Sequence, residues 1–226
     1  FGTIWIGTRN GLAKYNQRTD NFTGYISEGT SFGRPACNEI ISLMESSQGV
    51  LWAGTWYGGL ARFNKETGQF RYYFGEGDTL TIPRIRTLFQ RTANSFYLGS
   101  DDGLYTFNTT TGECLPTDDE QNKESIYACY QDREGGIWIG TYFSGVSYLS
   151  PKHKDIEWYY PNGTENSLSG NVISQFCEDP DGNIWIATED GGLNLFDPRT
   201  KKFKNHLLRS SNPTIGDHNI HALFYN

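Results

Sequence analysis

The sequence predicts an all-β fold: a β-propeller built from four-stranded antiparallel blades, with five blades' worth of strands. A segment with an aromatic residue between apolar ones, followed by a small residue and a hydroxyl residue, occurs at 4–8, 51–55, 96–100, 137–141 and 184–188. The central aromatic residues lie at positions 5, 52, 97, 138 and 185, so their spacings are 47, 45, 41 and 47 residues. This is the period of propeller blades with four strands.

Each repeat predicts four strands, which we call A to D in chain order. In the second repeat these strands are expected at 40–44, 51–55, 60–63 and 70–73. A polar turn follows strand A, a glycine turn follows strand B, and a polar hairpin joins strands C and D. Strand B is apolar on both faces, which a strand tolerates only when both sides of its sheet are covered. Blades packed face to face around an axis provide that cover.

The two ends of the sequence predict how the blades are completed. The sequence begins inside a turn between strands A and B, and its last residues, 219–226, align with the strand A residues 38–45. The chain 1–226 is therefore expected to be a single propeller domain, or a propeller fragment, with three strands, four complete blades and one further strand. Pairing 220–225 with 4–8 would close a five-bladed ring and remove the exposed edges, which we favour. The alternative is an open arc of a larger propeller.

Charge and composition argue against several function classes. The chain has 226 residues, of which 36% are hydrophobic and 15% aromatic, enough for a core buried between blades. Its formal net charge is −7 and its pI is about 5.1, and its lysines and arginines form no cluster in the sequence. These properties argue against nucleic acid as a partner and against membrane contact by this segment. The sequence holds no apolar run long enough to cross a bilayer.

Three patterns that could suggest a metal or redox site are better explained by the fold. Asp179–Gly182 opens like a calcium loop but lacks the later ligands, and it occupies a repeated turn position. His218 and His221 lie on an expected strand and point to opposite faces. Cys114, Cys129 and Cys177 replace apolar residues of strands, and Cys37 lies in a loop, which is typical of core cysteines. A single disulfide between two of them is the alternative in an oxidising compartment. We expect no metal, no cofactor and no catalytic residue.

The repeat also resembles a known family. Its fullest copy runs from Ser167 to Thr200 and includes the turn Glu178–Asn183, the strand Ile184–Thr188 and the glycines Gly191 and Gly192. These motifs resemble the two-component regulator propeller repeat. The resemblance implies the periplasmic sensor region of a hybrid two-component system histidine kinase of the Bacteroidetes type, associated with sensing of glycan fragments. Such sensors usually carry seven-bladed propellers, often two in tandem, followed by a β-sandwich, a membrane helix, a histidine kinase, a receiver and a DNA-binding module.

The expected binding face consists of the B–C turns and the D–A loops, which share one face of a propeller. The B–C turns have a constant frame but unlike tips: Arg9 and Asn10, Trp56 and Tyr57, Asp101 and Asp102, Tyr142 and Phe143, and Glu189 and Asp190. Aromatic rings that a turn does not require can stack on sugar rings, while carboxylates and amides bind hydroxyl groups. We therefore expect these residues to bind a ligand, framed by the long D–A loops 27–38, 75–83, 161–170 and 210–218. Alternatively, the rings cap the channel or contact a neighbouring domain.

Three function classes remain. The first, which we favour, is a noncatalytic sensor of oligosaccharides in the periplasm, as part of an inner-membrane protein. Its expected partners are a neighbouring propeller or sandwich domain of the parent chain, and a homodimer stays open. The second is a five-bladed glycoside hydrolase-like enzyme, in which Glu39, Asp101, Asp102, Glu189 and Asp190 supply the candidate carboxylates. The third is a propeller that binds proteins, although the chain lacks the Gly-His and Trp-Asp marks of the WD repeat.

Overall fold

The structure, a computed structural model, describes residues 3–27, 30–31, 34–35, 38–74, 80, 82, 84–117, 123–151, 156–206 and 219–224. These residues contain no α-helix, and their strands form one three-stranded sheet, four four-stranded sheets and one two-stranded hairpin. Neighbouring strands of each sheet follow one another in the chain, as the repeat predicts. The predicted all-β blades are therefore confirmed. The chain divides into two compact units, residues 1–120 and 121–226, and closure into one ring stays a prediction.

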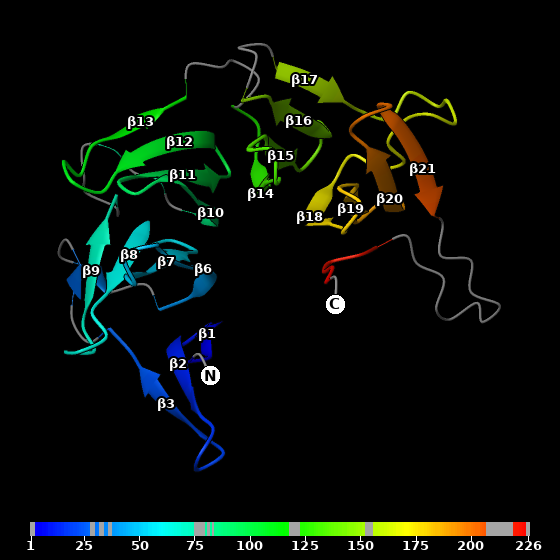
Figure 1. The fold of residues 1–226 in the computed structure, drawn as a ribbon. Helices are drawn as coiled ribbons and strands as arrows, with labels where there is room; N and C mark the ends of the chain where they lie inside the picture. Colours follow the sequence, from blue (N-terminus) through cyan, green and yellow to red (C-terminus); the bar gives the residue numbers. More distant parts are fainter. Residues whose placement is uncertain are drawn as a thin grey trace. The chain divides into compact units, whose positions relative to one another are not determined.

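The first unit contains three blades, drawn in blue to green in Figure 1. Blade 1 consists of β1 (Trp5–Thr8), β2 (Gly11–Asn16) and β3 (Asn21–Tyr25). Blade 2 consists of β6 (Ile40–Glu45), β7 (Leu51–Thr55), β8 (Leu60–Phe63) and β9 (Phe70–Tyr73). Blade 3 consists of β10 (Ile85–Thr92), β11 (Ser95–Ser100), β12 (Gly103–Asn108) and β13 (Cys114–Pro116). A short hairpin, β4 (Thr30–Ser31) with β5 (Arg34–Pro35), interrupts the segment that we expected to be only a loop.

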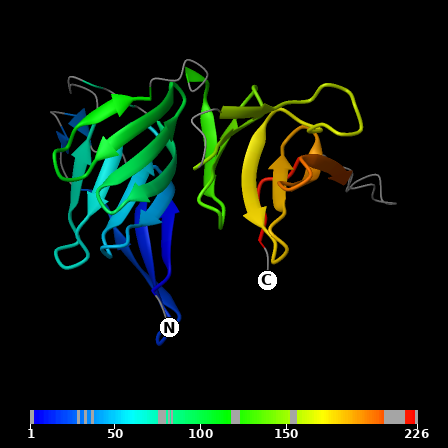
Figure 2. The ribbon, with the colours of Figure 1, turned by 45° about the horizontal axis from the view of Figure 1, so that its top comes forward.

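The second unit contains two blades, and Figure 2 shows the strands of each lying side by side. Blade 4 consists of β14 (Ile126–Gln131), β15 (Ile137–Thr141), β16 (Val146–Leu149) and β17 (Ile156–Tyr159). Blade 5 consists of β18 (Ile173–Glu178), β19 (Ile184–Thr188), β20 (Gly192–Asp197) and β21 (Lys202–His206). In all four-stranded blades the first to last strands are the predicted strands A to D.

The last described segment, 219–224, is not the strand that we expected. Its Ile220 N–H donates to the Thr188 carbonyl at 3.0 Å, and its Leu223 N–H donates to Oε1 of Gln175 at 2.7 Å. The Ser174 hydroxyl also donates to the Ile220 carbonyl. One backbone bond and two side-chain bonds to blade 5 do not make the regular ladder of a strand. The segment therefore docks on blade 5 without extending a sheet.

Tryptophans of strand B pack between neighbouring blades within each unit. Trp52 is 4% exposed, and its ring centroid lies 5.2 Å from that of Phe96 and 5.7 Å from that of Phe107, both in blade 3. Trp138 is 1% exposed and lies 5.3 Å, between ring centroids, from Phe196 of blade 5. These contacts place the aromatic residue of the repeat in the core between blades.

The other two tryptophans of strand B differ from each other. Trp5 meets Phe63 of blade 2 edge to face, with ring centroids 5.3 Å apart. Trp185 is half-buried, and among the described residues its ring meets only that of His206 in its own blade, at 5.4 Å. It points away from the face of blade 5 that packs on blade 4, so the expected packing between blades is not seen for Trp185.

An aspartate fixes the turn between strands A and B in blades 4 and 5. Asp132 accepts the indole N–H of Trp138 at 2.9 Å, and Asp179 accepts that of Trp185 at 3.2 Å. Burial disfavours the charge on Asp179, but hydrogen bonds from the Asn183 side chain and backbone and from Trp185 outweigh it and lower the pKa of this carboxyl below 3.8. The carboxylate oxygens of Asp179 are thus engaged within the turn, in agreement with its predicted structural role.

Candidate recognition site on the B–C turns

A hydroxyl residue at the end of strand B holds each B–C turn. Thr55 Oγ1 donates to the carbonyl of Gly59 at 2.9 Å and accepts the N–H of Gly58 at 2.8 Å. The same pair of bonds, at 2.8–3.1 Å, is made by Thr8, Ser100, Thr141 and Thr188. We call this residue the hydroxyl clamp. Because the clamp holds the turn through its backbone, the tip residues are free to differ.

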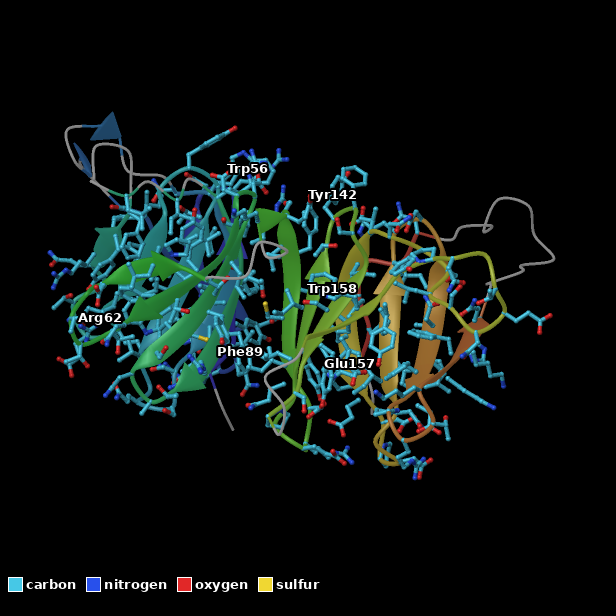
Figure 3. All side chains as sticks on the ribbon, turned by 90° about the horizontal axis from the view of Figure 1, so that it is seen from above. Trp56, Arg62, Phe89, Tyr142, Glu157 and Trp158 are labelled. Atoms are coloured by element: carbon cyan, nitrogen blue, oxygen red, sulfur yellow. The ribbon has the colours of Figure 1, made fainter. Side chains whose placement is uncertain are left out.

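The tip of blade 2 presents one supporting ring and one exposed ring. Trp56 is half-buried, since the guanidinium carbon of Arg84 lies 3.8 Å from its ring centroid. Tyr57 is 61% exposed, and its ring meets Trp56 edge to face at 6.1 Å. Figure 3 shows Trp56 at the end of its blade. Tyr57 is therefore the ring that a ligand can reach, while Trp56 holds the arginine through a cation–π contact.

Two arginines beneath this tip share one carboxylate. Nη1 of Arg84 donates to Oδ2 of Asp101 at 2.5 Å, and Nε of Arg86 donates to Oδ1 at 2.5 Å. The guanidinium carbon of Arg86 also lies 5.6 Å from the Trp56 ring centroid. Nε of Arg84 is buried and has no hydrogen-bond acceptor. We call Trp56, Tyr57, Arg84, Arg86 and Asp101 the arginine cluster.

A β-bulge at the start of strand A directs side chains to the same end of the blades. Each complete blade leaves one residue at the start of strand A out of the pairing with strand B; these residues are Ile41, Arg86, Tyr127 and Ser174. Blade 3 has a second shift near the end of its strand A, at Arg91. A bulge bends its strand and redirects the unpaired side chain. It brings Arg86 to Asp101 and Tyr127 to the tip of blade 4.

The tip of blade 4 has the same division of roles with an aromatic support. Tyr142 stacks on Tyr127 with ring centroids 4.8 Å apart and an interplanar angle of 19°. Phe143 is 66% exposed and meets Tyr142 edge to face at 4.1 Å. Figure 3 shows Tyr142 at the end of its blade. The exposed ring of this tip is Phe143, and the ring beneath Tyr142 is that of Tyr127.

The acidic tip of blade 5 is engaged in structural contacts. The Asp190 carboxylate accepts the N–H groups of Asn171 and Val172 at 3.0 and 3.1 Å, which ties the D–A loop to the B–C turn. Oε1 of Glu189 lies 3.3 Å from Nδ1 of His221, in the terminal segment. These two carboxylates stabilise loop structure in the second unit.

The tips of blades 1 and 3 are polar. Arg9 is 94% exposed, with its Nε 3.6 Å from Oε1 of Glu39, a surface pair of little energetic weight. Asn10 and Asp102 donate their backbone N–H groups to the hydroxyl clamps of their turns. Of the ten predicted residues, the structure thus joins Trp56, Tyr57 and Asp101 through Arg84, and it joins Tyr142 to Phe143.

Three cavities in the described part of the chain lie away from the predicted tips. One of about 590 Å³ lies at the C–D hairpin of blade 2 and is lined by Arg62, Lys65 and Arg71 among others. Two others, of about 480 and 230 Å³, lie at the rim of blade 3 and at the A–B turns of blades 4 and 5. None of these three cavities is lined by a predicted recognition residue.

The metal and cysteine predictions can be checked only in part. The described residues contain no group of three or more histidine, cysteine or acidic side chains that could hold a metal ion. Cys114, Cys129 and Cys177 are free, and burial raises the pKa values of Cys114 and Cys129 to about 12, so these two stay as unreactive thiols. Cys37, His218 and the D–A loop 210–218 lie outside the described residues, as does most of 75–83.

Sequence reasoning missed Arg84, Arg86 and Tyr127, the residues beneath the aromatic tips. A signal was present, because Arg86 and Tyr127 each follow the first isoleucine of a strand A and differ between repeats. An alternating apolar pattern predicts an ordinary strand at this position and does not predict the bulge that exposes it.

Comparison with known proteins connects these repeats to a family. Residues 35–57, 120–143 and 167–190 match the family model of the two component regulator propeller. Each match runs through strand A and strand B into the tip of the B–C turn. No curated protein matches the sequence.

Solved structures share the fold. The extracellular domain of a hybrid two component system from B. thetaiotaomicron has a TM-score of 0.79 and 22% identity, over 98% of this chain and 29% of that one. The extracellular domain of a one component system from the same organism has a TM-score of 0.60 and 21% identity, over 90% of this chain and 36% of that one. Virginiamycin B lyase from Staphylococcus aureus has a TM-score of 0.69 and 12% identity, over 95% of this chain and 69% of that one. The chain spans about a third of the length of the first two structures, and at these identities the likeness concerns the fold.

Proposed function

Because the chain contains two-component regulator propeller repeats, we propose that it is a noncatalytic extracytoplasmic recognition module of a two-component signalling protein. Its ligand is an oligosaccharide, bound on the face formed by the B–C turns. The observation that carries this proposal is the contrast between five hydroxyl clamps with the same pair of hydrogen bonds and five unlike tips, two of which present an exposed aromatic ring. A fixed frame with variable tips suits recognition of different ligands by related proteins.

Two exposed rings support a sugar ligand. Tyr57 and Phe143 stand outward from clamped turns, each braced by a second aromatic ring. Rings held in this way lose little conformational freedom when a flat sugar face stacks on them. Side-chain donors and acceptors beside Tyr57, in the arginine cluster, supply partners for hydroxyl groups.

The carboxylates that an enzyme would need are engaged elsewhere, which favours recognition over catalysis. Asp101 is held by two arginines, and Asp190 accepts two backbone N–H groups. Glu189 lies beside His221. A glycosidase needs two carboxyl groups free to reach the scissile bond, and these three are engaged in contacts within the chain. The likeness to a lyase concerns the fold, which does not carry function by itself.

The proposed setting is the periplasm, in a protein anchored in the inner membrane. The described residues contain no helix that could span a membrane. The two B. thetaiotaomicron structures of the same fold are extracellular domains of signalling systems. We propose a second propeller or a sandwich domain of the parent chain as the partner that receives the signal, with self-association as the alternative.

Binding measurements on single-ring variants test this proposal. The complete extracytoplasmic region is titrated calorimetrically with neutral and acidic oligosaccharides, as wild type and as the Tyr57→Ala and Phe143→Ala variants. Phe22→Ala is the matched control, because Phe22 is 59% exposed but lies on β3, away from the B–C turns. We expect Tyr57→Ala or Phe143→Ala to weaken binding at least about tenfold, as loss of a stacked ring does.

Two outcomes would contradict the proposal. If both tip variants bind like the wild type while Phe22→Ala does not, the recognition face lies elsewhere. If an oligosaccharide is cleaved and cleavage disappears in Asp101→Asn or Glu189→Gln, the chain is an enzyme.

A further inference from the structure

We infer that the arginine cluster recognises an acidic group on the oligosaccharide, so that the ligand is a sugar bearing a carboxylate or a sulfate. The inference rests on the proposed function and narrows its ligand class. It is carried by the charge of the cluster, by an unpartnered donor within it, and by the ring that stands beside it.

The cluster brings two cations together on a negative chain. The whole chain carries a formal charge of −7, whereas the guanidinium groups of Arg84 and Arg86 both contact the carboxylate of Asp101. A cation held in a partly buried place attracts an anion more strongly than one in open water, because the surroundings screen it less.

Arg84 has unused capacity to bind an oxyanion. Its Nη1 bonds Asp101, but its Nε–H is buried and has no acceptor. A buried donor of a charged group without a partner is costly, and a ligand oxygen that reached it would recover that cost. Guanidinium groups bind carboxylates and sulfates through two parallel N–H bonds, so an acidic ligand group satisfies this arginine better than a hydroxyl does.

The geometry at the tip favours a sugar ring that carries the acid. The guanidinium carbon of Arg84 lies 3.8 Å from the Trp56 ring centroid and 5.8 Å from that of Tyr57. The exposed Tyr57 ring thus stands within one sugar's width of the arginine. One monosaccharide can stack on Tyr57 while its acidic substituent reaches Arg84. A free anion would use the arginines but gain nothing from the ring.

Blade 4 gives an internal contrast. Its exposed ring, Phe143, meets Tyr142, which stacks on Tyr127, so a tyrosine stands here where Arg84 covers Trp56 in blade 2. Acid recognition is therefore assigned to blade 2 and apolar stacking to blade 4.

The test compares acidic probes with neutral counterparts of the same chain. Oligogalacturonates, their carboxyl-reduced forms, heparin fragments and desulfated, carboxyl-reduced heparin fragments are titrated into the complete extracytoplasmic region. Wild type is compared with Arg84→Gln and Arg84→Lys. Arg18→Gln is the control, since it removes an exposed charge of the same sign from the hairpin between β2 and β3, away from the B–C turns. Thermal melts confirm that each variant is folded.

We expect at least one acidic probe to bind, with an affinity that falls as salt rises and that its neutral counterpart lacks. Arg84→Gln should weaken this binding at least about tenfold, Arg84→Lys should weaken it less, and Arg18→Gln should leave it unchanged. Binding to uronate alone or to sulfate alone would identify the acidic group, and either supports the inference.

Three results would overturn it. Acidic binding that persists in Arg84→Gln places the acid site elsewhere. Binding of neutral probes with equal or higher affinity removes the acid preference but leaves the proposed sugar sensor standing. Absence of binding by any probe, neutral or acidic, contradicts the proposed ligand class as well.

Discussion

The tips of blades 2 and 4 have the same frame and unlike chemistry. In both, a threonine clamp holds a turn whose first tip residue is a braced aromatic ring and whose second is an exposed one. Beneath Trp56 lies Arg84, with Arg86 and Asp101 nearby, whereas beneath Tyr142 lies Tyr127. One tip is therefore supported by an arginine and the other by a tyrosine.

The difference indicates which residues can change the ligand that a tip binds without changing the blade. Hydrogen bonds to backbone atoms fix the turn, and packing of strand B fixes the blade, so neither depends on the tip. The residue that a bulge at the start of strand A releases can change without disturbing either. Changing Arg86 or Tyr127 alters the support beneath a tip and leaves the loop itself unchanged.

The largest effect is expected from the core that both blades share. Trp52→Ala and Trp138→Ala each remove a ring packed between two blades and should lower the free energy of unfolding by about 3–5 kcal/mol. Trp185→Ala should cost clearly less, since that ring is half-buried. Denaturant unfolding followed by circular dichroism measures all three. Equal losses for Trp138→Ala and Trp185→Ala would contradict the burial described for them.

A smaller, equal effect is expected from the two clamps. Thr55→Val and Thr141→Val keep the side-chain shape but remove both hydroxyl bonds, which leaves a turn N–H without its acceptor. Each should cost about 1–3 kcal/mol of stability. Thr19→Val is the control, because Thr19 is exposed and bonds only a surface asparagine. If the clamps behave like this control, the turns are held by something other than the hydroxyls.

The sequence predicted the frame of the molecule more fully than its candidate site. The recurring strand B defined the blades and the tips, because its period and its apolar faces are properties of backbone and core. The sequence predicted both residues of each aromatic tip without distinguishing them. In the structure Trp56 and Tyr142 each have a face covered, and Tyr57 and Phe143 are the exposed partners. Which of two adjacent tip residues turns outward depends on contacts with Arg84 and Tyr127, which local sequence does not reveal.

The salt dependence of stability distinguishes the residues beneath the two tips, Tyr127 in blade 4 and Arg84 in blade 2. Tyr127→Ala removes the ring that stacks on Tyr142 and should cost about 0.5–1.5 kcal/mol, independent of salt. Arg84→Gln removes a charged pair that is partly exposed, and any stability that it costs should shrink at 1 M salt. Melting curves at two salt concentrations distinguish the cases. If the loss of stability in Tyr127→Ala depends on salt, the contact with Tyr142 is not the stacking of two rings.

The smallest effect on stability is expected from the exposed rings themselves. Tyr57→Ala and Phe143→Ala should each change the free energy of unfolding by no more than about 0.5 kcal/mol, as surface substitutions do. Differential scanning fluorimetry measures the shift. A marked destabilisation by either variant would show that its ring packs against the protein and is not available to a ligand.

The central claim, that the B–C turns form the recognition face, is tested most directly by a binding footprint. Hydrogen–deuterium exchange of the complete extracytoplasmic region is measured with and without a saturating amount of the tightest-binding oligosaccharide from the panel. The account predicts that exchange at 56–59, 84–87 and 100–103 is slower with the oligosaccharide than without it. It predicts little change at 62–71, which line the cavity at the C–D hairpin of blade 2. Slower exchange confined to this cavity, with the B–C turns unchanged, would contradict the claim that the B–C turns form the recognition face.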